Sequence, residues 1–142
     1  MILLGADPLS RFLNRAATIP FTWGKHDCLL WLADWILERR GIDPAIGIRG
    51  GYDSILQAAR IVREAGGMQS LVDITTRPAG LSRTASAARG DIAVVQIAAD
   101  GGEHFGDQAG AILMSGSAAM LCQTGLVMPR FADIEIVAAW RV

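Results

Sequence analysis

The chain has 142 residues, with 13 Lys and Arg against 14 Asp and Glu and a net charge of −1. This length suits one domain with one core, and no basic run is longer than Arg39-Arg40, which argues against nucleic acid as the main partner because phosphate binding usually needs a basic face. Although 51% of the residues are hydrophobic, no stretch reaches the ~18 uninterrupted apolar residues of a spanning helix, so we expect a soluble protein without a membrane span.

The first part of the chain predicts two helices joined by a loop rich in aromatic residues. The first helix runs from residue 8 to about residue 15, with Pro8 in the first turn, where its missing N–H costs nothing. After the loop, Asp27 is a good N-cap for a strongly apolar helix over residues 28–40, and Gly41 supplies the left-handed residue on which helices often stop. Because it has few polar side chains, we expect this second helix to be central and buried.

The rest of the helical half is shorter and more interrupted. Residues 54–65 predict a further helix, which Tyr52-Asp53 caps at its start and Gly66-Gly67 stops. Residues 68–73 add one more helical turn. An irregular linker then begins at residue 74 and ends at Arg89-Gly90-Asp91.

The second half of the chain has the pattern of a sheet. Short apolar runs predict four strands, with a tight hairpin turn after the second of them. The predicted strands cover residues 92–97, 109–114, 118–123 and 134–140. Helices first and an antiparallel meander afterwards are typical of the α+β class, with helices packed on one side of the sheet. We therefore predict one domain over residues 1–142, mainly helical in 1–73 and mainly β in 90–142.

Cys28 lies where the aromatic loop turns into the apolar helix. The free amide groups and the macrodipole at a helix N-terminus favour an anion, so a cysteine there can have a lowered pKa and act as a nucleophile. The like charge of Asp27 and burial oppose this effect, and we expect a modestly activated thiol that alkylates faster than Cys122. The alternative is that Cys28 only packs in the core, because cysteine is among the most buried residue types. We expect both cysteines to stay reduced in a cytoplasmic protein.

Several short motifs occur in an order that carries a family resemblance. They are Phe21-x-Trp23-Gly24, Asp27-Cys28 opening a helix, Gly90-Asp91-Ile92 opening a strand and Gly110-Ala111-Ile112 in the next strand. This arrangement resembles the NlpC family of papain-like peptidoglycan peptidases. The Asp43-Pro44 and Arg49-Gly-x-Tyr52 segments and the closing residues 139–142 resemble, more closely, an uncharacterised group of short phage and prophage proteins related to that family.

The resemblance implies a papain-like fold and a set of catalytic positions. In active relatives the cysteine is the nucleophile, a histidine at the start of the strand after the Gly-Asp strand is its base, and a polar residue on the following strand orients that histidine. Matched onto this chain, Cys28 is the nucleophile, but Gln108 stands at the histidine position. A glutamine cannot accept the thiol proton. The orienting position falls near Cys122 or Gln123.

Other residues of the implied site also depart from the family pattern. The aromatic residue whose hydroxyl helps hold the oxyanion in relatives is matched by Phe21, which has no hydroxyl. The resemblance places Phe21, Trp23, Gly24 and Asp27 at the substrate, although Asp27 is more simply explained as a cap and Trp23 as a core or interface anchor. His104 could replace the missing base only if its loop folds back over the helix terminus.

Neither a metal nor another cofactor is expected. His26, Glu103, His104 and Asp107 lack a recognisable ligand spacing. His26 lies on the cap side of Cys28, where its ring would face away from the thiol or bond to the backbone. The glycines at 101, 102 and 106 do not lead from a strand into a helix, so a phosphate-binding loop has no support.

Two functions of different classes follow from the sequence. The first is a degenerate NlpC-like protein that has lost the catalytic histidine and serves as a structural or adaptor subunit, for instance at a phage-tail tip. It would be cytoplasmic before assembly and part of the virion afterwards, with other tail or assembly proteins as partners. The second is a cysteine peptidase or amidase that cleaves cell-wall peptide, with Cys28 as nucleophile and His104 as an unorthodox base. The missing histidine favours the first function.

Overall fold

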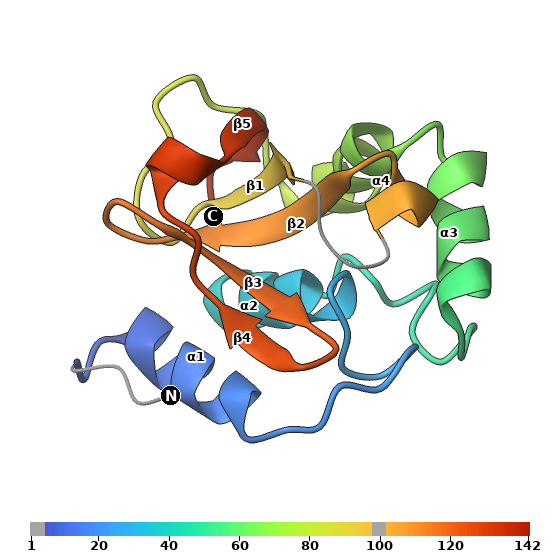
Figure 1. Cartoon of the computed structure of the whole chain (residues 1–142), viewed down its shortest axis with the longest axis horizontal. Helices are drawn as coiled ribbons and strands as arrows, with labels where there is room; N and C mark the ends of the chain where they lie inside the picture. The colour runs from blue at the N-terminus through green and yellow to red at the C-terminus, as the bar shows by residue number, and fades with distance from the viewer. Residues whose placement is uncertain (1–4, 98–101) are drawn as a thin grey trace.

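A computed structural model of the chain describes residues 5–97 and 102–142. Helices come first and strands follow (Figure 1). The α-helices are α1 (Pro8–Ala17), α2 (Leu30–Arg40), α3 (Ile55–Glu64) and α4 (Met68–Thr76). The strands are β1 (Ile92–Gln96), β2 (Gln108–Leu113), β3 (Ala118–Cys122), β4 (Gly125–Val127) and β5 (Glu135–Trp140). Three short 3-10 turns, η1 (Arg77–Ala79), η2 (Gly102–Phe105) and η3 (Phe131–Asp133), complete the order. The α+β class is therefore confirmed.

The sheet is antiparallel, with the strand order β4-β3-β2-β1-β5. The first three predicted strands, β1 to β3, form a meander, to which the unpredicted strand β4 adds, and the turn at 115–117 joins β2 to β3 as expected. The expectation of a simple meander was wrong for β5, which pairs with β1 at the other edge, with Ile92 opposite Trp140. The chain reaches that edge through the connection that holds η3, which bridges back to the start of β3 at Ser117 and Arg130.

The strand residues alternate between two buried faces. One face packs in a core with side chains of α1, α2 and α4, and contributes Ile92, Val94, Ile112, Ala119, Leu121 and Trp140. The other face forms a second cluster of Ala93, Val95, Ala111, Leu113, Ala118, Met120 and Ala139, in which no residue of the four α-helices takes part. The helices thus pack on one side of the sheet, and the buried residues of its other side pack with one another.

The helix boundaries differ from the predictions by a few residues. Helix α2 begins at Leu30, two residues after the predicted start, and Cys28 lies in the turn before it. Ser54 caps α3 by accepting a hydrogen bond from Gln57 N at 3.2 Å, so the expected Tyr52-Asp53 cap was wrong. Helix α4 is a full helix rather than one added turn. No helix in the described ranges is long and apolar enough to cross a membrane.

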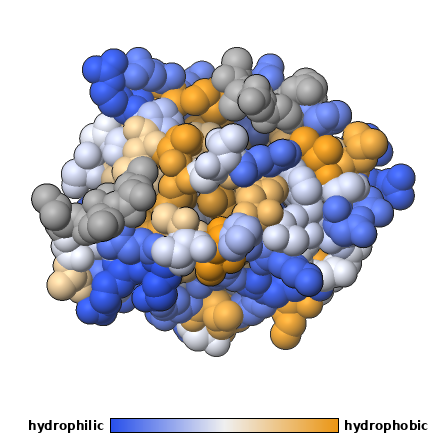
Figure 2. All heavy atoms as spheres, turned by 60° about the horizontal axis from the view of Figure 1, so that its bottom comes forward, coloured by the Kyte–Doolittle hydropathy of each residue, from blue (hydrophilic) through white to orange (hydrophobic). Residues whose placement is uncertain are grey.

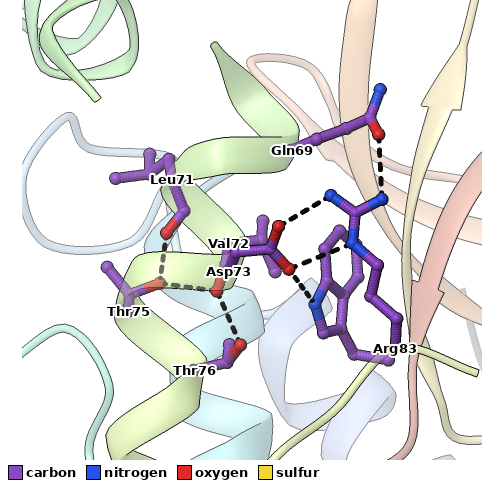
Figure 3. Close-up of polar contacts among 8 residues, drawn as sticks. Gln69, Leu71, Val72, Asp73, Thr75, Thr76 and Arg83 are labelled. Atoms are coloured by element: carbon purple, nitrogen blue, oxygen red, sulfur yellow. Dashed lines mark hydrogen bonds and ion pairs between the residues drawn. The ribbon is translucent and has the colours of Figure 1, made fainter. Parts of the chain in front are cut away.

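A polar cluster ties the linker after η1 to the helical half (Figure 3). Arg83 Nη2 and Nε donate to the Asp73 carboxylate at 2.7 and 3.1 Å, and Arg83 Nη1 donates to Gln69 Oε1 at 3.3 Å. The indole Nε1 of Trp140 donates to the same carboxylate at 2.9 Å, while the guanidinium lies 5.1 Å from the centre of the Trp140 ring. Helix α4, the linker after η1 and β5 therefore meet at one half-buried aspartate.

Candidate functional site

A cavity of about 320 Å³ lies between the loop before α2, the start of β2 and the β3–β4 hairpin. It brings together most of the residues that the resemblance implied: Phe21, Trp23, Cys28, Gln108, Cys122 and Gln123 all line it. Its other lining residues are Leu29, Ile55, Met68, Ile97, Phe105, Ala109, Gly110, Met120, Leu121, Thr124 and Val127. Figure 2 turns the bottom of Figure 1 toward the viewer, and hydrophobic residues gather in the middle of this face between hydrophilic ones.

Gly110 explains how Cys28 comes close to the sheet. A Cβ atom at this position would lie 2.4 Å from Leu32 Cδ1 and 3.5 Å from the Cys28 carbonyl oxygen. The strand and the turn that carries Cys28 are therefore in close contact, and a side chain at position 110 would force the end of the Leu32 side chain to move. This close approach places Cys28 and Gln108, two residues upstream of Gly110, around one cavity.

Asp27 organises the turn that carries Cys28. It is fully buried, and its carboxylate accepts hydrogen bonds from Leu29 N at 2.9 Å and Leu30 N at 2.8 Å. The N-cap residue of α2 is Leu29, which makes no side-chain cap hydrogen bond, so the predicted N-cap at Asp27 was wrong by two residues, although its carboxylate binds these two amides at the start of the helix. It also accepts from Gly24 N at 2.8 Å and from the Tyr52 hydroxyl at 2.6 Å. The Asp27 carboxylate thus binds groups of the surrounding loops. Neither Asp27 nor Gly24 lines the cavity.

Tyr52 is the site residue that sequence reasoning missed. It was predicted only as part of a helix cap, yet it is buried and its hydroxyl binds Asp27 across 25 positions of sequence. The loop around it also packs on Gly24, which has a φ of +83° and whose Cβ would lie 1.9 Å from the Tyr52 carbonyl oxygen. The only signal in the sequence was the Arg49-Gly-x-Tyr52 motif, which carried the family resemblance and did not indicate the contact with Asp27.

The thiol of Cys28 is not activated. Burial raises its pKa to about 12, and the nearby charge of Asp27 and then the Cys122 thiol add to this shift. The expectation of a modestly activated thiol was therefore wrong, since burial and Asp27 outweigh any effect of the helix terminus. Burial, together with the hydrogen bond to Asp27, also raises the pKa of the Tyr52 hydroxyl.

The two histidines lie away from the lining of the cavity. His26 is buried, and its Nε2 lies 3.1 Å from the carbonyl oxygen of Ala16, so the expected bond to the backbone is confirmed. His104 belongs to η2 and is exposed, and it is Phe105 of that turn that lines the cavity. No imidazole among the described residues therefore lines the cavity beside Cys28.

Gln108, at the implied histidine position, is held in a short chain of side-chain amides. It faces Gln96 across the β1–β2 ladder, and its Nε2 donates to Gln96 Oε1 at 3.2 Å. Gln96 Nε2 in turn donates to the carbonyl oxygen of Gly106 at 3.3 Å. In the same parts of the chain, 5–97 and 102–142, no group of three or more His, Cys, Asp or Glu side chains could hold a metal ion.

The comparisons with known proteins give one match. The model of a family described as Domain of unknown function (DUF6950) matches residues 6–142, so the chain belongs to this family. No curated protein matches, and no solved structure matches.

Proposed function

We propose that this chain is an NlpC-like domain of the papain-like superfamily that has lost its catalytic histidine. In this proposal it acts as a structural or adaptor subunit of a phage or prophage tail, cytoplasmic before assembly and part of the virion afterwards. The observation that carries the proposal is the content of the cavity, where Cys28 lies with Gln108 and where no imidazole is found among the described lining residues.

The chemistry of these groups supports a non-catalytic role. A thiol attacks a peptide carbonyl as the thiolate, and a nucleophile with a high pKa needs an adjacent base to take its proton. Burial and Asp27 keep the Cys28 thiol protonated at neutral pH, with a pKa of about 12. The carboxamide of Gln108 cannot take that proton. Losing the base of such a pair costs a rate factor of roughly 10³ or more.

One observation favours the alternative of a cysteine peptidase or amidase that acts on cell-wall peptide. Cys28 still lines a cavity at the start of a central helix, and η2, which carries His104, contributes Phe105 to the same cavity. In this alternative Cys28 is the nucleophile and His104 the base. A rearrangement of η2 would be needed to bring the imidazole to the thiol.

The test is release of peptide from purified peptidoglycan by wild type, Cys28→Ala, His104→Ala and Gln108→His. We expect no turnover that depends on Cys28 in wild type, and Gln108→His is the variant in which some could arise. Cys122→Ala is the matched control, since it removes the other thiol of the cavity. Wild-type hydrolysis that disappears in both Cys28→Ala and His104→Ala, and persists in Cys122→Ala, would establish the peptidase instead.

A further inference from the structure

The described part of the lining of the cavity beside Cys28 carries no charged side chain. Of its described lining residues none is Asp, Glu, Lys, Arg or His, and the polar side chains are two glutamines, one threonine and two thiols. The rest of the lining is aliphatic or aromatic, with Phe21, Trp23 and Phe105 as the large members. Moving an ion from water into such a lining costs roughly several kcal/mol, so a charged occupant is disfavoured. The lining selects an uncharged ligand.

The orientation of Gln108 adds a specific polar group to this lining. The carbonyl oxygen of Gly106 can only accept a hydrogen bond, so Gln96 must turn its NH₂ group toward it. The Oε1 atom of Gln96 then faces Gln108, whose own NH₂ group must donate to it. The opposite side of the Gln108 carboxamide is its Oε1 atom. The relay from Gly106 thus fixes which end of the Gln108 carboxamide binds Gln96, and it leaves Oε1 of this cavity-lining residue, with the second N–H, on the side away from Gln96.

We propose that the cavity binds an apolar residue of an uncharged peptide segment, and that Gln108 Oε1 accepts a backbone amide N–H of that residue. Its volume of about 320 Å³ is near the lower end of the ~300–1,000 Å³ of ligand pockets, and it suits a single residue with its flanking amides. The aromatic residues provide the apolar contact. The inference rests on the proposed function in that the cavity serves binding and not turnover.

Gln96 has the part of a positioning residue. It does not line the cavity, but it holds the amide of Gln108 in the acceptor orientation. Removing it frees that amide to rotate and to present either its oxygen or its nitrogen. The affinity for an N–H donor should then fall less than on removal of Gln108 itself, and the preference for a donor should weaken.

The experiment titrates the full chain with N-acetylphenylalanine N-methylamide and follows the side-chain NH₂ signals of Gln108 and the indole signal of Trp23 by NMR. Two comparison probes are N-acetylphenylalanine, which carries a carboxylate, and the analogue in which both amide nitrogens are methylated to remove their N–H groups. One lost hydrogen bond corresponds to about a 10-fold change in affinity, so we expect each comparison probe to bind about 10-fold more weakly or worse.

The variants make the assignment residue-specific. Gln108→Met keeps the length of the side chain and removes the acceptor. Its affinity for the N–H probe should therefore fall about 10-fold, and its affinity for the methylated probe should change little. In Gln96→Met the affinity for the N–H probe should fall about 3-fold, and the difference in affinity between the N–H probe and the methylated probe should become smaller. Gln69→Met is the matched control, because Gln69 lies in the Arg83 cluster outside the cavity, and it should change nothing.

Two outcomes would overturn the inference. One is the absence of signal changes at Gln108 and Trp23 with the N–H probe in the wild-type chain. The other is equal binding of all three probes. Both are distinct from failure of the proposed function, which appears as release of peptide from peptidoglycan that depends on Cys28 and is measured separately.

Discussion

A buried carboxylate, Asp27, and a half-buried one, Asp73, organise different parts of this molecule in different ways. Asp27 is fully buried and is satisfied by neutral donors alone: three backbone N–H groups and the Tyr52 hydroxyl. Asp73 is more exposed and is paired with the guanidinium of Arg83 and the indole of Trp140 (Figure 3). Both tie distant segments together. They differ in whether a positive charge lies beside the negative one.

This difference decides what each carboxylate does to its neighbours. Without a cation in its hydrogen-bond shell, Asp27 acts on the groups around it and contributes to the raised pKa of Cys28 and of Tyr52. The pKa of Asp73 is itself held below its usual range, first by the hydrogen bond from Arg83 and then by that from Trp140. A buried anion with neutral donors therefore suppresses a neighbouring nucleophile, whereas a paired anion mainly anchors the fold.

The largest expected effect is on stability, from Asp27→Ala. The change leaves four donors without their acceptor in the interior, and buried unsatisfied groups cost about 1–3 kcal/mol each. We expect a loss of about 5 kcal/mol in the free energy of unfolding, measured by urea denaturation. Asp73→Ala, which removes the carboxylate that is paired with a cation, is the control. Equal losses in the two variants would show that burial and charge pairing do not separate these carboxylates.

The second effect concerns the reactivity of Cys28 in a Cys122→Ala background. Because its pKa rises from 9.0 to about 12, the thiolate fraction at pH 8 should be about 10³-fold lower in the folded chain than in the unfolded chain. Iodoacetamide should therefore label the folded protein about 10³-fold more slowly than the protein in urea. A raised pKa favours the protonated fold, so this contribution to stability is present below pH 9.0 and is lost as the pH rises through about 12. A labelling rate that reaches half of its plateau near pH 9 in the folded state would contradict the raised pKa.

Tyr52→Phe gives a smaller and more specific effect. It keeps the buried ring and removes one donor to Asp27, and a hydrogen bond to a charged group contributes about 1.5–3 kcal/mol. We expect a loss of about 2 kcal/mol in the free energy of unfolding, with an unchanged slope against urea. In the double variant with Asp27→Ala the losses should not add, because both changes remove the same bond. Additive losses would place the role of Tyr52 elsewhere.

The sequence predicted the elements better than their partners. The apolar run without Gly or Pro and the stop at Gly41 predicted the end of α2, and its start to within two residues, since helix signals are local. The resemblance to the NlpC family implied that Cys28 and Gln108 share one site, and both line the same cavity. The edge position of β5 had no local signal, because pairing with β1 is set by long-range packing. Strand β4, with only the three residues Gly125–Val127, is too short for a pattern to show.

The pKa values at the site were harder to predict than the residues that form it. The sequence places Asp27 next to Cys28, but it does not say whether Asp27 has a cation beside it or how deeply the thiol is buried. The partner that matters, Tyr52, is 25 residues away and offers a neutral hydroxyl. Burial then turned the expected activation of Cys28 into suppression. Pairwise partners and burial belong to the tertiary structure, and the pKa depends on both.

The smallest effect belongs to the exposed side of the comparison. Asp73→Asn removes the charge that Arg83 binds and keeps an oxygen that can accept from Trp140. Exposed ion pairs contribute little, so we expect a loss of about 1 kcal/mol at pH 7, measured by urea denaturation. The pKa of Asp73 is lowered from 3.8 in the folded state, so its contribution is present above that value and is lost as the pH falls below it. The difference between wild type and Asp73→Asn should therefore shrink on going from pH 5 to pH 2. A difference that stays constant over this range would mean that Asp73 anchors the linker through its hydrogen-bond geometry and not through its charge.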